Sequence, residues 1–308
     1  MFLLALNREE IMKTTTPKQD MYAQITDAII ALLESGKTSK LTWARTGNGL
    51  PCNHKTGTAY QGVNVLLLWA AAMTHGYASD RWLTYKQAAA MGGQIRKGEK
   101  SVTCVFFKTI ERESKSDGDS AKETESVRVM SPFWLFNLDQ IDGIEAPQAA
   151  APRSEFQQID AAEAVLIHSG AVIREAGEKA FYRPSTDEIY LPERTRFASM
   201  IEFYSVAQHE LTHWAGAKHR LARDFADRFG TEAYAFEELI AELGSAFLNA
   251  ELGFSATMIP NHAGYIDVWL KVLKNNKRAI FTAANQASKA HRYIMDLVER
   301  NRSEQQAA

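Results

Sequence analysis

QHELTHWAGA, residues 208–217, contains two histidines four positions apart, with a glutamate directly after the first. On a helix, positions four apart share a face, so the imidazoles of His209 and His213 can bind one metal ion. Glu210 then lies where a general base can take a proton from water beside that ion. This HExxH pattern is typical of zinc peptidases, whose catalytic ion needs a third protein ligand from elsewhere in the chain.

The third ligand is expected on a helix predicted over FEELIAELG, residues 236–244. Glu238 and Glu242 lie four apart on one face of that helix. We predict that Glu238 binds the metal and that Glu242 orients a histidine, with the reverse assignment as the alternative. Glu237 is expected to point elsewhere. Two simpler interpretations remain, an interior histidine pair and a solvated acidic face, although the apolar neighbours make unpaired carboxylates costly.

Two further features near the histidines have types suited to peptide hydrolysis. DEIYLP, residues 187–192, reads as a strand before the histidine helix, either an edge strand that can pair an extended peptide or ordinary sheet. His262 and Tyr265 lie three apart and have side chains suited to hydrogen-bonding a tetrahedral oxyanion, with purely structural roles equally open.

The chain has 308 residues, 45% of them hydrophobic and 23% charged, which is ordinary globular composition with room for two cores. The stretch EAPQAAAPR, residues 145–153, is rich in Pro and Ala without apolar periodicity and predicts a linker. We therefore predict a flexible extension over 1–20, a first domain over 21–144 and a second over 154–300. Within the first domain, the polar residues 113–126 predict a mobile loop.

Apolar spacing predicts an α+β fold whose second domain is mainly helical with a small sheet. Helices are expected at Met21–Glu34, from Val63, and at Ile159–Ser169, Ser199–Trp214, Tyr234–Leu252 and Ala263–Asn275. Strands are expected at Ser101–Lys108, Val127–Leu138, Ala171–Glu175, Lys179–Arg183 and Asp187–Pro192. The first two strands should form a hairpin around the polar loop.

Charge is divided unevenly along the chain. Between residues 21 and 110 there are 10 Lys and Arg and 4 Asp and Glu, a balance of +6 that leaves −8 for the remainder of a chain with net charge −2. Aromatic side chains lie near these cations, and stacking rings beside phosphate-binding cations form a platform for single-stranded nucleic acid. The candidate nucleic-acid-binding residues are Trp43, Arg45, Lys55, Tyr60, Arg81, Trp82, Tyr85, Lys86, Arg96, Lys97 and Lys100. The alternative is that the aromatic residues belong to the core.

The sequence also indicates a compartment. Cys52 and Cys104 stand alone without metal-ligand or disulfide-scaffold spacing, which fits a reducing cytosol. No secretory signal is apparent at the N-terminus, and no apolar run is long enough for a membrane span. We therefore predict a soluble cytoplasmic protein without a membrane partner.

Several motifs together resemble one known family. LPCNHKTGTAYQGVNVLLLW, RWLTYKQAAAMGG, RKGEKSV and FNLDQIDGI are similar to the N-terminal single-strand-binding domain of ArdC-type antirestriction proteins, which TraC-type conjugative primases share. QHELTHWAGA, EELIAELGSAFL and NHAGYIDVWL resemble the zincin-type metallopeptidase domain that follows it in ArdC. The resemblance runs from about Met21 to Leu297, with the motifs in the expected order.

The resemblance implies a plasmid-encoded protein that binds single-stranded DNA and protects incoming conjugative DNA from host restriction. It implies that His209, His213 and a glutamate of EELIAEL hold the metal and that Glu210 is the general base. Zn²⁺ is the expected ion, although two histidines and a carboxylate also accept Mn²⁺, Co²⁺ or Fe²⁺. A host restriction-system protein or another protein substrate is a further expected partner. The rival interpretation is a DNA-binding protein whose metal only stabilises the fold.

Overall fold

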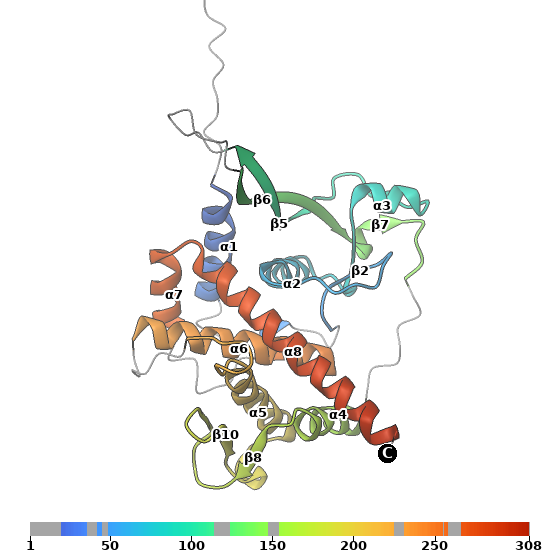
Figure 1. Cartoon of the computed structure of the whole chain (residues 1–308). Helices are drawn as coiled ribbons and strands as arrows, with labels where there is room; N and C mark the ends of the chain where they lie inside the picture. The colour runs from blue at the N-terminus through green and yellow to red at the C-terminus, as the bar shows by residue number, and fades with distance from the viewer. Residues whose placement is uncertain are drawn as a thin grey trace, which may run out of the picture.

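The computed structural model describes residues 20–35, 42–44, 49–113, 124–146, 154–224, 231–254, 256–257 and 266–307. Its fold is mixed α+β, which confirms the predicted class. The N-terminal part contains the larger sheet and the C-terminal part is mainly helical (Figure 1).

The N-terminal part is built around a long antiparallel hairpin. Its elements are α1 (Met21–Ser35), β1 (Thr42–Ala44), β2 (Cys52–Asn53), α2 (Val63–His75), β3 (Arg81–Leu83), α3 (Tyr85–Ala90), β4 (Gln94–Ile95), β5 (Val102–Glu113), β6 (Thr124–Asn137), η2 (Leu138–Gln140) and β7 (Ile141–Asp142). Strands β5 and β6 pair in register from Val102↔Leu135 to Glu113↔Thr124, so the predicted hairpin is confirmed and extends further than its apolar residues indicated. Of the predicted loop, residues 114–123 lie outside the described part of the chain.

Helix α2 supports this sheet, whose strand order is β2-β3-β6-β5. Leu68 packs in one buried cluster with Trp82, Cys104 and Leu135 from three strands. At the β5 edge, the side-chain amide of Asn64 donates to the Val105 carbonyl at 2.8 Å and its oxygen accepts from the Val105 amide at 2.9 Å. The helix thereby satisfies backbone groups that an edge strand would otherwise leave unpaired.

The C-terminal part consists of helices around a small sheet. Its elements are α4 (Glu155–His168), β8 (Val172–Glu175), β9 (Phe181–Arg183), β10 (Glu188–Leu191), η3 (Arg194–Arg196), α5 (Met200–Ala215), α6 (Glu232–Leu252), β11 (Ala256–Thr257), α7 (Ile266–Asn275) and α8 (Ala279–Ala307). The predicted helices and strands are confirmed to within a few residues. Residues 263–265 of the last predicted helix, with Tyr265 among them, lie outside the described residues, as does His262.

Of the two alternatives for DEIYLP, the edge strand is wrong and ordinary sheet is confirmed. Strand β10 lies in the middle of the three-stranded sheet, parallel to β8 and antiparallel to β9. Ile189 and Leu191 are fully buried, so this strand holds the core of the sheet. Both of its hydrogen-bonding edges are occupied, and it cannot accept an added peptide strand. Apolar alternation identifies a strand but does not give its position in the sheet.

One hydrophobic core extends across the predicted linker. Ile29 and Leu33 of α1 and Leu66 of α2 share a buried cluster with residues of α6, α7 and α8. In Figure 1, α1 and α2 lie between the β5–β6 hairpin and these C-terminal helices. Strand β1 also pairs with β11 from the other end of the chain. The division at 145–153 stays a prediction, and residues 147–153 lie outside the described part.

Candidate metal centre

Helix α5 places the histidines in the interior. It begins after Ser199, whose hydroxyl accepts a hydrogen bond from the Glu202 amide at 3.1 Å. Phe203, Ala207 and Leu211 recur at helical spacing and pack into the buried core. Because the helix is surrounded by neighbours, its polar positions are buried as well: His209 is 2% exposed and Glu210 is 8% exposed.

Helix α6 supplies the carboxylates. It begins after Thr231, whose hydroxyl accepts from the Tyr234 amide at 3.1 Å, and it ends at Gly253 in the left-handed conformation. A Cβ built on Gly244 would lie 2.5 Å from the Thr212 Cγ2 atom of α5. The absence of a side chain at Gly244 therefore allows the close approach of the two helices that brings the histidines beside the glutamates.

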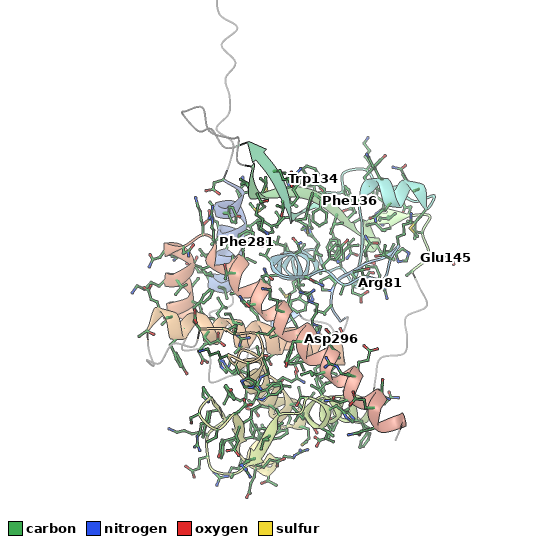
Figure 2. All side chains as sticks on the ribbon, in the orientation of Figure 1. Arg81, Trp134, Phe136, Glu145, Phe281 and Asp296 are labelled. Carbon is green, nitrogen blue, oxygen red and sulfur yellow. The ribbon has the colours of Figure 1, made fainter. Side chains whose placement is uncertain are left out.

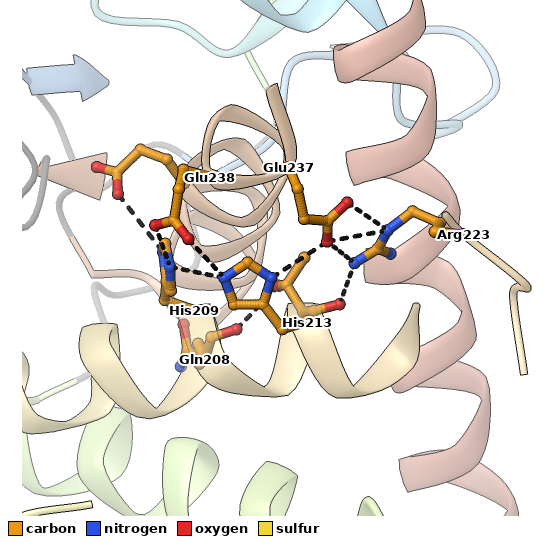
Figure 3. A network of polar contacts seen from close by, with 8 residues as sticks. Gln208, His209, His213, Arg223, Glu237 and Glu238 are labelled. Carbon is orange, nitrogen blue, oxygen red and sulfur yellow. Dashed lines mark hydrogen bonds and ion pairs between the residues drawn. The ribbon is translucent and has the colours of Figure 1, made fainter. Parts of the chain in front are cut away.

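The predicted ligand set converges at one point. Ligand atoms of His209, His213 and Glu238 all lie within 4.8 Å of one another. The two Nε2 atoms are 3.1 Å apart, and each lies 3.5 Å from an oxygen of Glu238 (Figure 3). Glu242 lies behind this cluster, with its Oε2 3.7 Å from the Nδ1 of His209. The geometry thus favours Glu238 as the ligand and Glu242 as the orienting carboxylate.

Sequence reasoning missed two residues of this network. Glu237, which was expected to point elsewhere, has its Oε1 3.1 Å from Nδ1 of His213. Arg223 donates to the same carboxylate, at 2.7 Å from Nη2 and 3.2 Å from Nε (Figure 3). Glu238 thus approaches the Nε2 atoms of both rings, whereas Glu237 approaches the opposite nitrogen, Nδ1, of His213 alone. Nothing in the local sequence around Arg223 signals its role.

The electrostatics of the cluster suit a cation. With neutral imidazoles, the guanidinium of Arg223 is set against four buried carboxylates, those of Glu210, Glu237, Glu238 and Glu242. Burial would lower the pKa of His209, but Glu238 and Glu242 raise it to about 10. Burial acts in the same direction on His213, whose pKa Glu237 and Glu238 raise to about 9. Protons thus supply positive charge that a divalent metal can replace, and the nitrogen and oxygen donors fit such an ion.

The candidate nucleic-acid residues divide into buried and exposed sets. Trp82 is 1% exposed and lies in the α2–sheet cluster, so its predicted role in stacking is wrong. Tyr60 packs against the same cluster. Arg81 is half-buried and pairs with Asp80 at 3.2 Å. The exposed candidates are Lys55, Tyr85, Lys86, Arg96, Lys97 and Lys100. Arg45 lies outside the described residues, and of Trp43 only its place in β1 is described.

Aromatic side chains that the sequence did not single out are exposed on the hairpin. Trp134 of β6 is 54% exposed, and it pairs with Thr103 of β5. It lies two residues from Phe136, hence on the same face of the strand; both residues are labelled in Figure 2. Phe136 packs against the buried cluster that includes Ala88 of α3. Tyr85, at the start of α3, is 57% exposed. Strand alternation in SPFWLFN could have indicated Trp134, whose neighbour Leu135 is fully buried.

Comparison with known proteins identifies the family. The model of the N-terminal domain of anti-restriction factor ArdC matches residues 19–136, and that of a zincin-like metallopeptidase matches residues 160–286. This chain is similar to the antirestriction protein ArdC from plasmid R388, whose crystal structure superposes on it with a TM-score of 0.75. The two sequences are 38% identical, and the match covers 91% of this chain and 98% of the R388 protein. The chain belongs to the ArdC family of antirestriction proteins.

Relatives of this ArdC-family protein differ in length. An uncharacterised protein of Sinorhizobium fredii is 40% identical over 281 residues, covering 89% of this chain and 91% of that protein. DNA primase TraC of Escherichia coli is 37% identical over 305 residues, which span 94% of this chain but 28% of the primase. The chain thus corresponds to a minor part of TraC.

A second structure of R388 ArdC is Mn(II)-bound and superposes with a TM-score of 0.74. Together with the zincin-like family match and the clustered ligands, it supports a divalent metal in this ArdC-family protein. Among its described residues, no helix is long and apolar enough to cross a membrane.

Proposed function

We propose that this ArdC-family protein binds single-stranded DNA with its N-terminal part, carries a metal-dependent peptidase site between α5 and α6, and protects incoming conjugative DNA from restriction in the cytoplasm. The observation that carries the peptidase proposal is the convergence of His209, His213 and Glu238 beside the buried Glu210. A host restriction-system protein is the proposed type of substrate.

The residues of the site would have separate roles in metal binding and proton transfer. His209, His213 and Glu238 would hold the ion, and Glu242 would accept a hydrogen bond from Nδ1 of His209. When bound, Zn²⁺ or Mn²⁺ supplies Lewis-acid polarisation of a peptide carbonyl and acidifies water. Glu210 would take the proton from the attacking water and pass it to the leaving amine. For His262 and Tyr265, oxyanion binding stays a proposal.

A Glu210→Gln variant tests the enzymatic proposal. The amide preserves size and hydrogen bonding but cannot accept the proton, so peptide cleavage should fall at least ~100-fold while metal content stays at the parent value. Restriction protection is then measured in cells carrying each form. If the loaded parent protein cuts no peptide of a substrate library yet protects DNA, the metal has a structural role and the rival function is correct.

The DNA-binding proposal rests on exposed aromatic and basic side chains of the N-terminal part. Trp134 and Tyr85 present rings to solvent, and the cations Lys86, Lys97 and Lys100 are exposed as well. Rings of this kind stack on unpaired bases while the cations follow the phosphates. The positive charge of this part is opposite in sign to that of the remainder, so a polyanion should bind here.

Trp134→Ala provides the direct test of that surface. Stacking on one base is worth about 1–3 kcal/mol, so affinity for a single-stranded oligonucleotide should fall about 5- to 150-fold. Phe156→Ala is the matched control, because this ring on α4 is 82% exposed but belongs to the C-terminal part. Equal losses in both variants, or equal parent affinity for single strands and duplex at every salt concentration, would refute the stacking platform.

A further inference from the structure

We infer that Arg223 is a positioning residue for the metal site, acting through Glu237 on the ring of His213. This inference deepens the proposed metal centre and rests on it. Arg223 lies after α5, in a segment that the sequence motifs do not cover, and it is not itself one of the proposed ligands. Its guanidinium instead binds the carboxylate of Glu237, which in turn contacts the ligand His213.

The contacts form a continuous chain from the guanidinium to the imidazole. Arg223 donates from Nε at 3.2 Å to each oxygen of Glu237, and from Nη2 at 2.7 Å to Oε1. The same Oε1 lies 3.1 Å from Nδ1 of His213. Nη2 also donates to the carbonyl of Thr212 at 2.7 Å, which ties the guanidinium to the last turn of α5. One carboxylate is thereby fixed relative to both helices.

This arrangement decides which ring nitrogen of His213 faces the other ligands. In the neutral ring, a carboxylate at Nδ1 accepts the hydrogen bond that Nδ1–H donates, so that the lone pair lies on Nε2, the atom 3.5 Å from Glu238. The carboxylate can do so only if it is held in place. Glu237 is 6% exposed, and a buried carboxylate requires a paired cation for this. Arg223, which is 8% exposed, provides one.

Gly216 provides the space for the guanidinium. A Cβ on Gly216 would lie 2.5 Å from Cζ and 2.5 Å from Nη2 of Arg223, closer than real side chains approach. The backbone of the two residues is also joined, since the Arg223 amide donates to the Gly216 carbonyl at 2.8 Å. A substitution at Gly216 should therefore displace the Arg223 side chain without changing any charged group.

Arg220 offers a matched control three residues away. Its guanidinium stacks 3.8 Å above the ring of Trp214 and pairs with Asp187 on the small sheet. It is buried like that of Arg223, with its side chain 6% exposed, but it donates to the Trp214 carbonyl and to Asp187 rather than to Glu237. Removing this guanidinium disturbs the same segment without removing the partner of Glu237.

The test compares Arg223→Met, Arg223→Lys, Gly216→Ala and Arg220→Met with the parent. Affinities for Zn²⁺ and Mn²⁺ are measured by chelator competition, and visible absorption after Co²⁺ loading reports ligand geometry. Loss of an outer partner of a metal ligand typically costs about 10- to 100-fold in affinity, which we expect for Arg223→Met and Gly216→Ala. Arg223→Lys should recover part of the loss. Arg220→Met should change affinity less than about 3-fold and leave the Co²⁺ spectrum unchanged.

Two results would overturn the inference. One is an Arg223→Met protein that melts earlier without metal but binds metal with parent affinity and spectrum, which indicates a purely structural arginine. The other is an equal loss of affinity in Arg220→Met. Should Arg223→Met not fold, Glu237→Gln and Gly216→Ala carry the same test. A parent protein that binds no divalent metal stoichiometrically would instead refute the metal centre itself.

Discussion

Replacing Gly244 with alanine tests whether the approach of α5 and α6 builds the metal centre. The added Cβ would lie 2.5 Å from Cγ2 and 2.7 Å from Oγ1 of Thr212. Thr212 is fully buried, and its hydroxyl donates to the Gln208 carbonyl at 2.8 Å. Because a β-branched side chain has few rotamers in a helix, it cannot turn away freely. The two helices must then separate.

Two opposing effects determine how much Gly244→Ala changes the free energy of unfolding. Alanine is favoured over glycine in a helix interior by about 0.5–1 kcal/mol, whereas overpacking a core costs about 1–3 kcal/mol. We expect a net loss of about 1–2 kcal/mol in the free energy of unfolding, or about 2–3 °C in melting temperature. Metal affinity should fall as well, because the helix that bears His209 and His213 moves away from the helix that bears Glu238.

Thermal melting of the metal-free protein measures the first effect, and chelator competition measures the second. The matched control is Gly244→Ala in a Thr212→Ala background, which removes both of the closest atoms and leaves the 3.1 Å approach to Cβ. There the same substitution should be nearly neutral. A Gly244→Ala variant that melts at a higher temperature than the parent, as helix propensity alone requires, would refute the reasoning.

Two further predictions concern residues outside the proposed metal centre. Burial lowers the pKa of His291 to about 4, below the value of about 6.5 in an unfolded chain, so its contribution to stability is complete above pH 6.5 and is lost as the pH falls towards 4. His291→Phe should remove up to about 3 kcal/mol of this pH dependence in urea titrations. Asn64→Ala should lower the free energy of unfolding by about 1–3 kcal/mol, because the backbone amide and carbonyl of Val105 both lose the Asn64 side chain as hydrogen-bond partner. Hydrogen exchange at the Val105 amide should accelerate.

Periodicity made most elements predictable, and one motif gave most of the metal site. His209 and His213 are four apart on a helix, so their shared face follows from helix geometry alone. Glu238 and Glu242 follow from the same rule applied to α6. In contrast, Glu237 depends on how two helices are placed side by side, and Arg223 on the course of an irregular segment. Such placements arise from tertiary packing, which local patterns do not encode.

The nucleic-acid candidates show a related difficulty. Trp82 and Trp134 both neighbour residues with strand propensity, yet one is 1% exposed and the other 54% exposed. Trp82 lies in β3, inside the four-stranded sheet and beneath α2, whereas Trp134 lies on a face that α3 covers only in part. The sequence gives the alternation along each strand. Which face is covered depends on helices elsewhere in the chain.

The shared core changes how the two proposed activities can be separated. Separating the two parts of the chain at residues 147–153 would expose Ile29, Leu33 and Leu66, which share a buried cluster with residues of α6, α7 and α8. A fragment that ends there would present a large apolar surface, so its failure to bind DNA would report misfolding as readily as a missing contact. Point variants of the full chain avoid this. Glu210→Gln removes one proposed function and Trp134→Ala the other, while the common core stays intact.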